Sequence, residues 1–353
     1  MSIYKQIRFG LYGCNMYRTR DLIEGANAAA GDVVKITACY DLDPDKARIA
    51  SEKYGGTVFD REEDFLTCPE VDVVLISLPA YLHAQAFINT AKAGKDVYLE
   101  KPICVNDLDR DAILAVHRDY PVRCYVGLSY RYIAPFRKIA EILRRPEAGK
   151  IIGIHHHWLA PEVEEPEVSG WRHRLDQSGG QLIHHCCHVL DWFEWIGGPT
   201  TSVMANAINV TEGPLPHEER EITACFNFAQ SGMAVFNLSQ HSHQYVQFGS
   251  VHTENLGLEY RWGDRTFVRL YKTRSRAADE VFEWSSSDQV GDGGEKDRNR
   301  LQMGEFIAAY LSAAPMPISI EQGIRTYDLA SAVRESYRSG HRMSVSPWRR
   351  ETL

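Results

Sequence analysis

The sequence has little of what marks a membrane protein or a nucleic-acid-binding protein. No apolar run approaches the roughly 20 residues that a membrane helix needs. The opening residues, MSIYKQIRFG, lack the apolar stretch of a secretory signal. Acidic residues outnumber basic ones, 47 against 39, and no basic stripe accompanies the net charge of −8. We therefore expect neither a membrane nor a nucleic acid among its partners.

The eight cysteines are scattered and include no C-x-x-C pair. In a chain of this length, that pattern is typical of reduced thiols and predicts a cytoplasmic protein without a disulfide framework. Histidine is the unusual residue. There are 14 histidines, and six of them fall in two short clusters, at 155–157 and 184–188.

The chain has 353 residues, of which 44% are apolar and 24% are charged. At about 150 residues per domain, this length predicts two domains. The composition is that of a globular protein, and it excludes extended disorder, collagen-like repeats and coiled coils.

Short apolar runs alternate with helical patterns in the first third of the chain. Asp43 and Pro44 form a typical helix start, a capping carboxylate followed by proline in the first turn. The alternation predicts βαβ units and a doubly wound, Rossmann-like parallel sheet that ends near Gly127. The expected strands are 7–12, 33–40, 71–77, 96–99 and 122–127, and the expected helices are 16–30, 44–54, 82–93 and 106–119.

Long alternating segments dominate the rest of the chain and predict a large open, mostly antiparallel sheet in an α+β domain. We therefore divide the chain into a nucleotide-binding domain, 1–127, and a substrate-binding and oligomerisation domain, 128–353. The last helix is a candidate to pack back on the first domain. The expected strands are 151–159, 201–211, 221–229, 233–241, 247–253, 257–262 and 266–271, and the expected helices are 135–145, 180–196, 298–312 and 321–339.

The turn after the first strand reads Gly13-Cys14-Asn15-Met16-Tyr17-Arg18. Against the dinucleotide-binding pattern G-x-G-x-x-G, only Gly13 matches, and Asn15 and Arg18 stand at the second and third glycines. Asn15 tolerates left-handed backbone, but its side chain would crowd a pyrophosphate. Arg18 is too large for the close helix–strand contact that the third glycine permits. A plain strand–turn–helix therefore stays open beside a nucleotide-binding turn.

Asp41 ends the second strand, where an acidic side chain accepts hydrogen bonds from the adenosine ribose of a dinucleotide. A carboxylate there repels a 2′-phosphate, so it favours NAD over NADP. The alternative is that Asp41 only caps the following turn.

Four further motifs occur in one order. They are Ser77-Leu78-Pro79-Ala80-Tyr81-Leu82-His83; Glu100-Lys101-Pro102; Tyr130-Arg131-Tyr132 with Pro135; and Trp171-Arg172 ahead of a Gly179-Gly180 segment that contains His184 and His188 and ends at Asp191. Together they make the chain resemble the glucose–fructose oxidoreductase / inositol dehydrogenase / rhizopine-catabolism (Gfo/Idh/MocA) family. The resemblance covers nearly the whole chain and implies hydride transfer between a nicotinamide and a sugar, cyclitol or related polyol.

By this resemblance, Lys101 is the active-site lysine, which hydrogen-bonds the reacting oxygen and stabilises its negative charge. His188 matches the catalytic histidine, which takes the hydroxyl proton as hydride leaves the same carbon. Glu100 and Pro102 shape the loop around Lys101, and a cis peptide before Pro102 is one form that proline permits. We expect Asp191 to be structural.

His184 stands where the family usually has an acidic residue, four positions before the catalytic histidine. This spacing places His184 and His188 on one face of the expected helix. The exchange removes a negative charge beside Lys101, and two imidazoles near an ammonium group are both pushed towards neutrality. We expect His184 to assist His188 as a hydrogen-bond partner, while lost or redirected activity is the alternative.

The histidine spacing also admits a metal site, with His184 and His188 as a helical pair and His155 and His157 alternating on a strand. However, the sequence contains no H-E-x-x-H motif, and a third ligand would have to come from folding. We expect no metal and assign these imidazoles to the polar lining of a sugar pocket.

The remaining expectations concern contacts and assembly. The expected cofactor, NAD, is assigned to Gly13, Asn15, Met16, Asp41, Ser77, Pro79, His83, Glu100 and Lys101. The expected substrate contacts are Tyr130, Arg131, His157, Trp171, Arg172, His184 and His188. A broad one-sided sheet is unusual on a monomer, so we expect a homodimer or homotetramer made through it.

Two other functions stay open. One is an NAD-dependent glycoside-cleaving enzyme that oxidises the sugar transiently, eliminates the aglycone and reduces the product again. The other is a non-catalytic nucleotide- or sugar-binding relative, which Asn15, Arg18 and His184 would favour.

Overall fold

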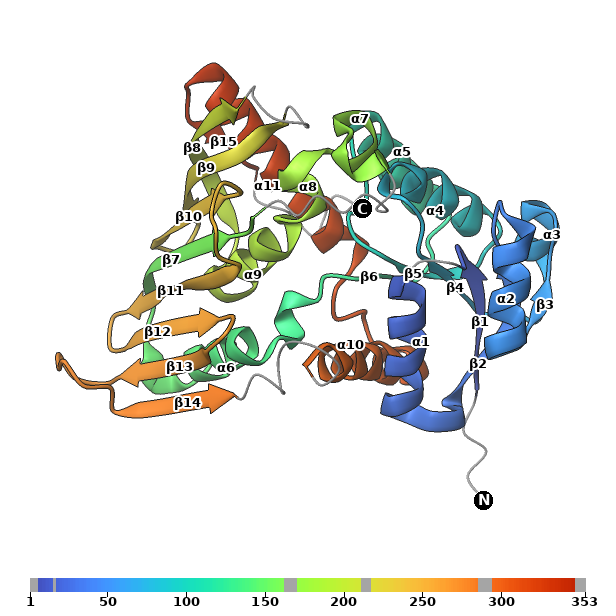
Figure 1. The fold of residues 1–353 in the computed structure, drawn as a ribbon, viewed down its shortest axis with the longest axis horizontal. Coiled ribbons are helices and arrows are strands. Elements are labelled where there is room, and N and C mark those ends of the chain that lie inside the picture. Colours follow the sequence, from blue (N-terminus) through green and yellow to red (C-terminus); the bar gives the residue numbers. More distant parts are fainter. Residues whose placement is uncertain (1–5, 15–16, 162–169, 211–216, 285–293, 347–353) are drawn as a thin grey trace. The chain divides into compact units, whose positions relative to one another are not determined.

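The computed structural model describes residues 6–14, 17–161, 170–210, 217–284 and 294–346 (Figure 1). The chain divides into two compact units. The first comprises 1–129, 176–179 and 296–324, and the second comprises 130–175, 180–295 and 325–353. The first unit thus extends beyond the expected nucleotide-binding domain, because it takes up most of helix α10 (Gly294–Leu311) and the start of α11 (Ile320–Ser339).

The first unit contains a six-stranded sheet in the order β3-β2-β1-β4-β5-β6, in which every pair is parallel. The expected Rossmann-like sheet is confirmed. The strands are β1 Ile7–Tyr12, β2 Val34–Tyr40, β3 Thr57–Val58, β4 Val73–Ile76, β5 Asp96–Leu99 and β6 Cys124–Val126. The other helices are α1 Tyr17–Ala30, α2 Pro44–Tyr54, α3 Glu62–Thr67, α4 His83–Lys92 and α5 Asp107–Asp119. Sequence reasoning missed β3 and α3, which are too short to show a period.

Local chemistry explains these elements. The side chain of Asp43 accepts a hydrogen bond from the backbone of Asp45, so it caps α2 as expected. Strand β4 is buried along its whole length, as in a parallel sheet covered on both faces (Figure 1). Helix α10 packs on this sheet through the ring of Phe306, which contacts three aromatic rings. These are Phe9, Tyr98 and Tyr125, at 5.8, 5.4 and 5.7 Å.

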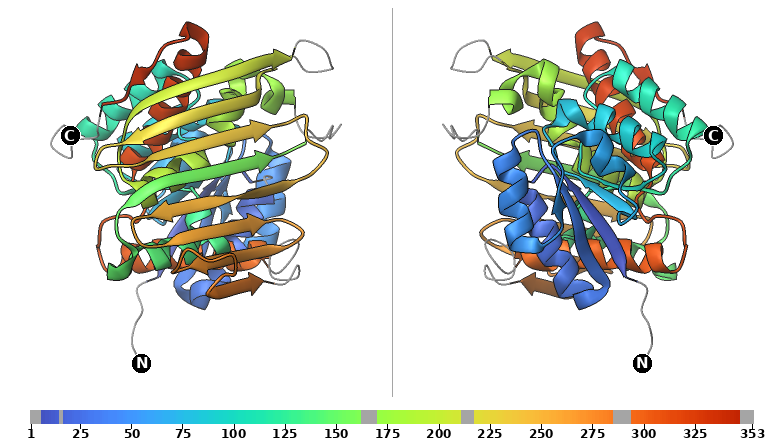
Figure 2. Two further views of the ribbon diagram at one scale, coloured as in Figure 1. Left: turned by 90° about the vertical axis from the view of Figure 1, so that its left-hand side faces the viewer. Right: turned by 90° about the vertical axis from the view of Figure 1, so that its right-hand side faces the viewer.

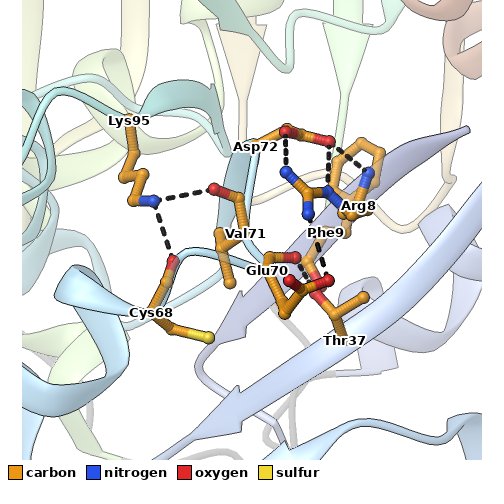
Figure 3. Close-up of polar contacts among 8 residues, drawn as sticks. All are labelled: Arg8, Phe9, Thr37, Cys68, Glu70, Val71, Asp72 and Lys95. Carbon is orange, nitrogen blue, oxygen red and sulfur yellow. Dashed lines mark hydrogen bonds and ion pairs between the residues drawn. The ribbon is translucent and has the colours of Figure 1, made fainter. Parts of the chain in front are cut away.

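An ion pair joins β1 and β4 where both strands begin. Figure 3 shows the guanidinium of Arg8 donating to both carboxylate oxygens of Asp72, at 3.0 and 2.7 Å, and reaching Glu70. Beside it, Lys95 donates to the backbone carbonyls of Cys68 and Val71. These contacts stabilise the edge of the sheet opposite to the one where the strands end.

The second unit contains a nine-stranded sheet in the order β14-β13-β12-β11-β7-β10-β9-β8-β15. Of the described strand pairs in this second sheet, only β7 and β10 run parallel, so the expected mostly antiparallel sheet is confirmed. Sequence reasoning missed the edge strands β14 and β15. The strands are β7 Ile151–Leu159, β8 Thr200–Val210, β9 His217–Phe228, β10 Met233–Ser239, β11 Val246–Thr253, β12 Gly257–Trp262, β13 Thr266–Tyr271, β14 Glu280–Trp284 and β15 Met343–Ser344.

The two faces of this sheet differ. One face packs against α6 (Ala134–Leu143), α9 (Cys187–Gly197) and part of α11, while Figure 2 (left) shows the other face without a helix of the same unit in front of it. The covered face holds an aromatic core around the buried His156, whose ring lies within about 6 Å of five aromatic rings. These belong to Phe136, Trp192, Phe193, Phe236 and Tyr260.

Candidate active site

The carboxyl ends of the parallel strands form one edge of the first unit, and four predicted site residues follow them. Gly13 comes after β1, Asp41 after β2, Ser77 after β4 and Glu100 after β5. The strand order reverses between β1 and β4. In open α/β sheets, this reversal marks the crevice where ligands bind.

Gly13 makes the tight turn that a dinucleotide site requires. Its φ is +93°, and a Cβ atom there would clash with the backbone of Ser77. Its amide donates to the carbonyl of Tyr40 at 3.0 Å, and Thr19 donates to its carbonyl at 3.1 Å. Only glycine fits this position, so the turn suits the close approach of a pyrophosphate. Asn15 and Met16 lie outside the described residues.

The carboxylate of Asp41 holds the backbone of two neighbouring turns, one after β1 and one after β2. One carboxylate oxygen accepts from the amide of Cys14 at 2.8 Å, and the other accepts from the amide of Asp43 at 3.0 Å. Asp41 therefore caps the turn that follows β2, and its ribose contact stays a prediction. These bonds also place a carboxylate next to the Gly13 turn, where the predicted ribose contact would be made.

Arg18 occupies the position of the third glycine, and its side chain is directed into the first unit. The guanidinium donates to Glu100 Oε1 at 3.0 Å, to Gln302 Oε1 at 2.9 Å and also to Asn299. The bulk of Arg18 is thus accommodated between α1, the end of β5 and α10. Sequence reasoning missed this role, because two of the partners lie more than 280 residues away in the chain.

The Glu100-Lys101-Pro102 loop contains a cis peptide between Lys101 and Pro102, as anticipated. Glu100 is buried and Lys101 is half-buried. The buried His83 joins this loop to the loop after β4: its Nδ1 lies 2.6 Å from the carbonyl oxygen of Pro102, and its Nε2 lies 2.9 Å from that of Leu78.

Both ring nitrogens of His83 therefore face backbone carbonyls. Burial lowers the pKa of His83, although the two carbonyls act in the opposite direction, and a neutral imidazole donates to one of them at a time. His83 thus lies between the two loops, and its cofactor contact stays a prediction. Ser77 is buried beside it and donates its amide to the carbonyl of Tyr12 at 3.0 Å, while Pro79 is half-buried in the same loop.

In the second unit, the predicted helix 180–196 is wrong as a continuous element. Helix α8 (Gly180–His184) ends before α9 begins at Cys187, and a turn lies between them. The amide of Cys186 donates to the carbonyl of Gln181, and the amide of His188 donates to that of His185. Since the ladder changes register there, the helical spacing no longer places His184 and His188 on one face.

His188 stacks on Tyr130. The ring centroids are 4.8 Å apart and the rings are nearly parallel, at 2°. The opposite face of Tyr130 stacks on Phe136 at 5.0 Å, and its hydroxyl accepts a hydrogen bond from Gln247 Nε2 at 2.5 Å. Tyr130 therefore packs between polar and aromatic neighbours and supports the His188 ring, while its substrate contact stays a prediction.

The buried His184 meets two rings edge to face, those of Trp171 at 5.2 Å and His185 at 4.5 Å. The guanidinium of Arg172 lies 5.6 Å from the centre of the Trp171 ring. The structure thus brings together three predicted substrate residues, His184, Trp171 and Arg172.

Arg131 forms a buried, bidentate ion pair with Asp191, with Nε donating at 2.8 Å and Nη2 at 2.5 Å. Its guanidinium also lies 5.4 Å from the Trp195 ring. This pair fastens the segment that holds Tyr130 to α9. The expected structural role of Asp191 is confirmed, and Arg131 shares that role.

His157 lies on the face of the sheet opposite to that of Trp158. It stacks on Phe248, at 4.8 Å and 6°, while the next residue, Trp158, is buried beside Tyr130 on the other face. Successive side chains of a strand point to opposite faces. His157 therefore lies on the other face of the sheet from Tyr130, and its substrate contact stays a prediction.

Comparison with known proteins identifies the class. Residues 7–128 match the model of the oxidoreductase family with an NAD-binding Rossmann fold, and residues 136–258 match the Gfo/Idh/MocA C-terminal domain. The chain therefore belongs to the Gfo/Idh/MocA family of oxidoreductases, and its first unit is an NAD-binding domain. The Gly13 turn fits that cofactor.

Individual relatives are distant. The chain is 26% identical to an uncharacterized oxidoreductase of Streptococcus pneumoniae over 75% of its own length and 65% of the relative. It is 25% identical to 2,7-anhydro-N-acetylneuraminate hydratase of Mediterraneibacter gnavus over 61% and 53%. The matched part of the chain thus spans about half to two thirds of these curated relatives.

Two solved structures share the fold. The WlbA dehydrogenase from Bordetella pertussis, in complex with NADH and UDP-GlcNAcA, has a TM-score of 0.79 and 20% identity over 97% of this chain and 98% of its own. A levoglucosan dehydrogenase in complex with NADH has a TM-score of 0.83 and 17% identity over 97% and 100%.

None of the described helices is long and apolar enough to cross a membrane. Within the described ranges, no group of three histidine, cysteine, aspartate or glutamate side chains is arranged to hold a metal ion.

Proposed function

We propose that the protein is an NAD-dependent dehydrogenase that acts on a sugar, cyclitol or related polyol. One observation carries the proposal. The Glu100-Lys101-Pro102 loop follows β5 at the same sheet edge as the Gly13 turn, in a domain that belongs to an NAD-binding oxidoreductase family. Lys101 thereby lies at the sheet edge that would hold the cofactor.

In this proposal the nucleotide-binding edge holds NAD, which supplies the hydride acceptor when bound. Gly13 would let the chain approach the pyrophosphate, and Asn15 and Met16 are proposed cofactor contacts as well. Asp41 would accept hydrogen bonds from the adenosine ribose and repel a 2′-phosphate. Ser77, Pro79 and Glu100 would shape the loops at the same edge.

The proposed reaction moves one hydride and one proton. Bound NAD would supply the hydride acceptor, and the substrate hydroxyl would give its proton to His188 Nε2 or Nδ1 as the C–O bond becomes a carbonyl. Lys101 donates a hydrogen bond to the reacting oxygen and offsets the negative charge that develops there. Tyr130 keeps the His188 ring in one orientation, and His184 assists as a polar neighbour.

The sugar or polyol class is supported by the pairing of aromatic and polar groups around His184. Trp171 offers an apolar ring to sugar C–H surfaces, and Arg172 offers donors to hydroxyls. The names of two similar proteins include a sugar substrate. One is the levoglucosan dehydrogenase. The other is a dTDP-3,4-didehydro-2,6-dideoxy-alpha-D-glucose 3-reductase of Actinomadura kijaniata, which is 25% identical over 50% of this chain and 52% of its own length.

A second candidate is catalysis without net oxidation, in which the sugar is oxidised, undergoes elimination and is reduced again. The relative named as a hydratase favours it. Such an enzyme would release product without accumulating NADH. A dehydrogenase would form NADH in a 1:1 ratio with oxidised product.

We also propose that the uncovered sheet face joins copies of the chain into a homodimer or homotetramer. Large apolar side chains on that face support this, namely Met204, Ile208 and Met233, which are 40%, 64% and 39% exposed. A monomeric mass in light scattering would contradict the assembly. We place the protein in the cytoplasm, because all eight cysteines are thiols.

The function is tested first by calorimetric titration with NAD and NADH, and then by a panel of sugars and polyols monitored through NADH absorbance. The proposal expects NAD binding and 1:1 NADH formation with at least one member of the panel. Failure to bind NAD(H), together with no nucleotide released on denaturation, would contradict it and favour a non-catalytic relative.

A further inference from the structure

We propose that Arg18 is a positioning residue for Lys101, because it fastens the Glu100-Lys101-Pro102 loop to the first helix of the nucleotide-binding unit. The inference rests on the role proposed for Lys101. It gives a function to the residue that departs most from the dinucleotide-binding pattern.

The guanidinium of Arg18 is held from two sides. On one side, Asn299 and Gln302 of α10 accept two of its N–H groups. Both of these side chains are buried. On the other side, its Nε donates to Glu100 Oε1 at 3.0 Å. Arg18 therefore links α10, which holds its guanidinium, to the carboxylate of Glu100.

The α10 side of this link is held in place because α1 and α10 are in close backbone contact. A Cβ atom at Gly25 of α1 would lie 2.7 Å from the backbone carbon of Asn299. Only glycine allows this approach, so the two helices leave no room for a shift between them. The position of the guanidinium is thus set by helix packing as well as by its hydrogen bonds.

The Glu100 carboxylate is confined as well. A Cβ atom at Gly127 would lie 2.7 Å from Glu100 Oε1, so the backbone after β6 closes the carboxylate from the side. The side chains of Arg18 and Glu100 are only 12% and 7% exposed. A buried pair of this kind costs little when intact, but losing one partner leaves an uncompensated charge.

Lys101 is the next residue after Glu100, and Pro102 follows it. The loop is consequently held at both ends, by Arg18 at Glu100 and by His83 at the carbonyl of Pro102. Arg18 also lies in the first turn of α1, directly after the segment that starts at Gly13. Arg18 therefore links the start of α1 to the loop that carries Lys101.

Loss of Arg18 would leave the buried Glu100 carboxylate without this partner and would loosen the loop that carries Lys101. The half-buried Lys101 side chain should then become more accessible to solvent. A merely structural cross-link would affect stability without a change at Lys101.

The test uses the full-length protein without a sugar. The rate of Lys101 acetylation by acetic anhydride is followed by mass spectrometry across pH, and NADH affinity is measured by fluorescence. Arg18→Gln is compared with Arg18→Lys and with the double variant Arg18→Gln/Glu100→Gln. Arg8→Gln is the matched control, since Arg8 pairs with Asp72 at the opposite edge of the same sheet.

Arg18→Gln is expected to speed acetylation of Lys101 about tenfold at neutral pH, because its loosened loop exposes the amine, and to weaken NADH binding by a similar factor. The double variant removes the unpaired carboxylate and should recover the acetylation rate to within about threefold, while Arg18→Lys should lie between. Arg8→Gln should lower the melting temperature and leave both values unchanged.

The proposal is overturned if Arg18→Gln changes stability as Arg8→Gln does, with Lys101 acetylation and NADH affinity unchanged. If Arg18→Gln does not fold, the double variant and Arg18→Lys decide by the same two values. Because no sugar is present, failure of the proposed dehydrogenase reaction would not produce either result.

Discussion

The ring of Tyr130 lies parallel to the imidazole of His188, with centroids 4.8 Å apart and an angle of 2° between the rings. Phe136 covers the other face of Tyr130, and Gln247 anchors its hydroxyl. This arrangement makes Tyr130 a support for the ring of the proposed catalytic base.

Tyr130→Leu should lower kcat about tenfold, because a small misplacement of the base is costly. Tyr130→Phe keeps the stacked ring and should leave kcat within about threefold. It should still destabilise the protein by about 1 kcal/mol, since Gln247 loses its acceptor. Steady-state kinetics and thermal melts of both variants check this, and equal kcat values in the two would contradict it.

His83→Ala should destabilise the first unit by about 2 kcal/mol, because two buried backbone carbonyls lose their contacts with the imidazole. It should also lower kcat, since the Pro102 end of the Lys101 loop is released. Gln85→Ala, an exposed position on the same helix, is the control and should change neither. A His83→Ala variant with normal kcat would show that the link made by His83 between the two loops does not act on Lys101.

Asp41→Asn should shift the cofactor preference towards NADP by about tenfold in kcat/KM, which corresponds to roughly 1.4 kcal/mol. The amide keeps an oxygen to accept from Cys14, so the turn should survive. Calorimetric affinities for both cofactors measure the shift. An unchanged ratio would mean that Asp41 is only a cap.

Stability should fall in mild acid because of His156. Burial lowers the pKa of His156 from 6.5 to about 3. The unfolded chain therefore binds the proton first, so the stability contributed by neutral His156 is complete above pH 6.5 and is lost as the pH falls towards 3. At pH 5 the loss is about 2 kcal/mol. Differential scanning calorimetry should show a smaller pH effect in His156→Gln; an identical profile would refute this assignment.

Much of the fold could be predicted from local chemistry. The apolar run of β4, the capped start of α2 and the alternation of strands and helices all act over a few residues, so they are legible in the sequence. The motif around Lys101 could be predicted in the same way, because its residues are contiguous in the sequence.

The rest depends on contacts between distant residues. The partner of Arg18 in α10 could not be inferred from a turn near the start of the chain, and the break between α8 and α9 carries no glycine or proline to announce it. Alternation places His155 and His157 on one face, but only the packing of Trp158 beside Tyr130 decides which face that is.

The most direct test of the account is the rate of NADH formation by Lys101→Ala at saturating NAD and substrate, beside its affinity for NADH. The account predicts a loss of about 10²–10³-fold in kcat, the usual effect of removing a group that stabilises the developing charge, with NADH affinity within about threefold of the unmodified protein. A Lys101→Ala variant that forms NADH at the original rate would contradict the central claim.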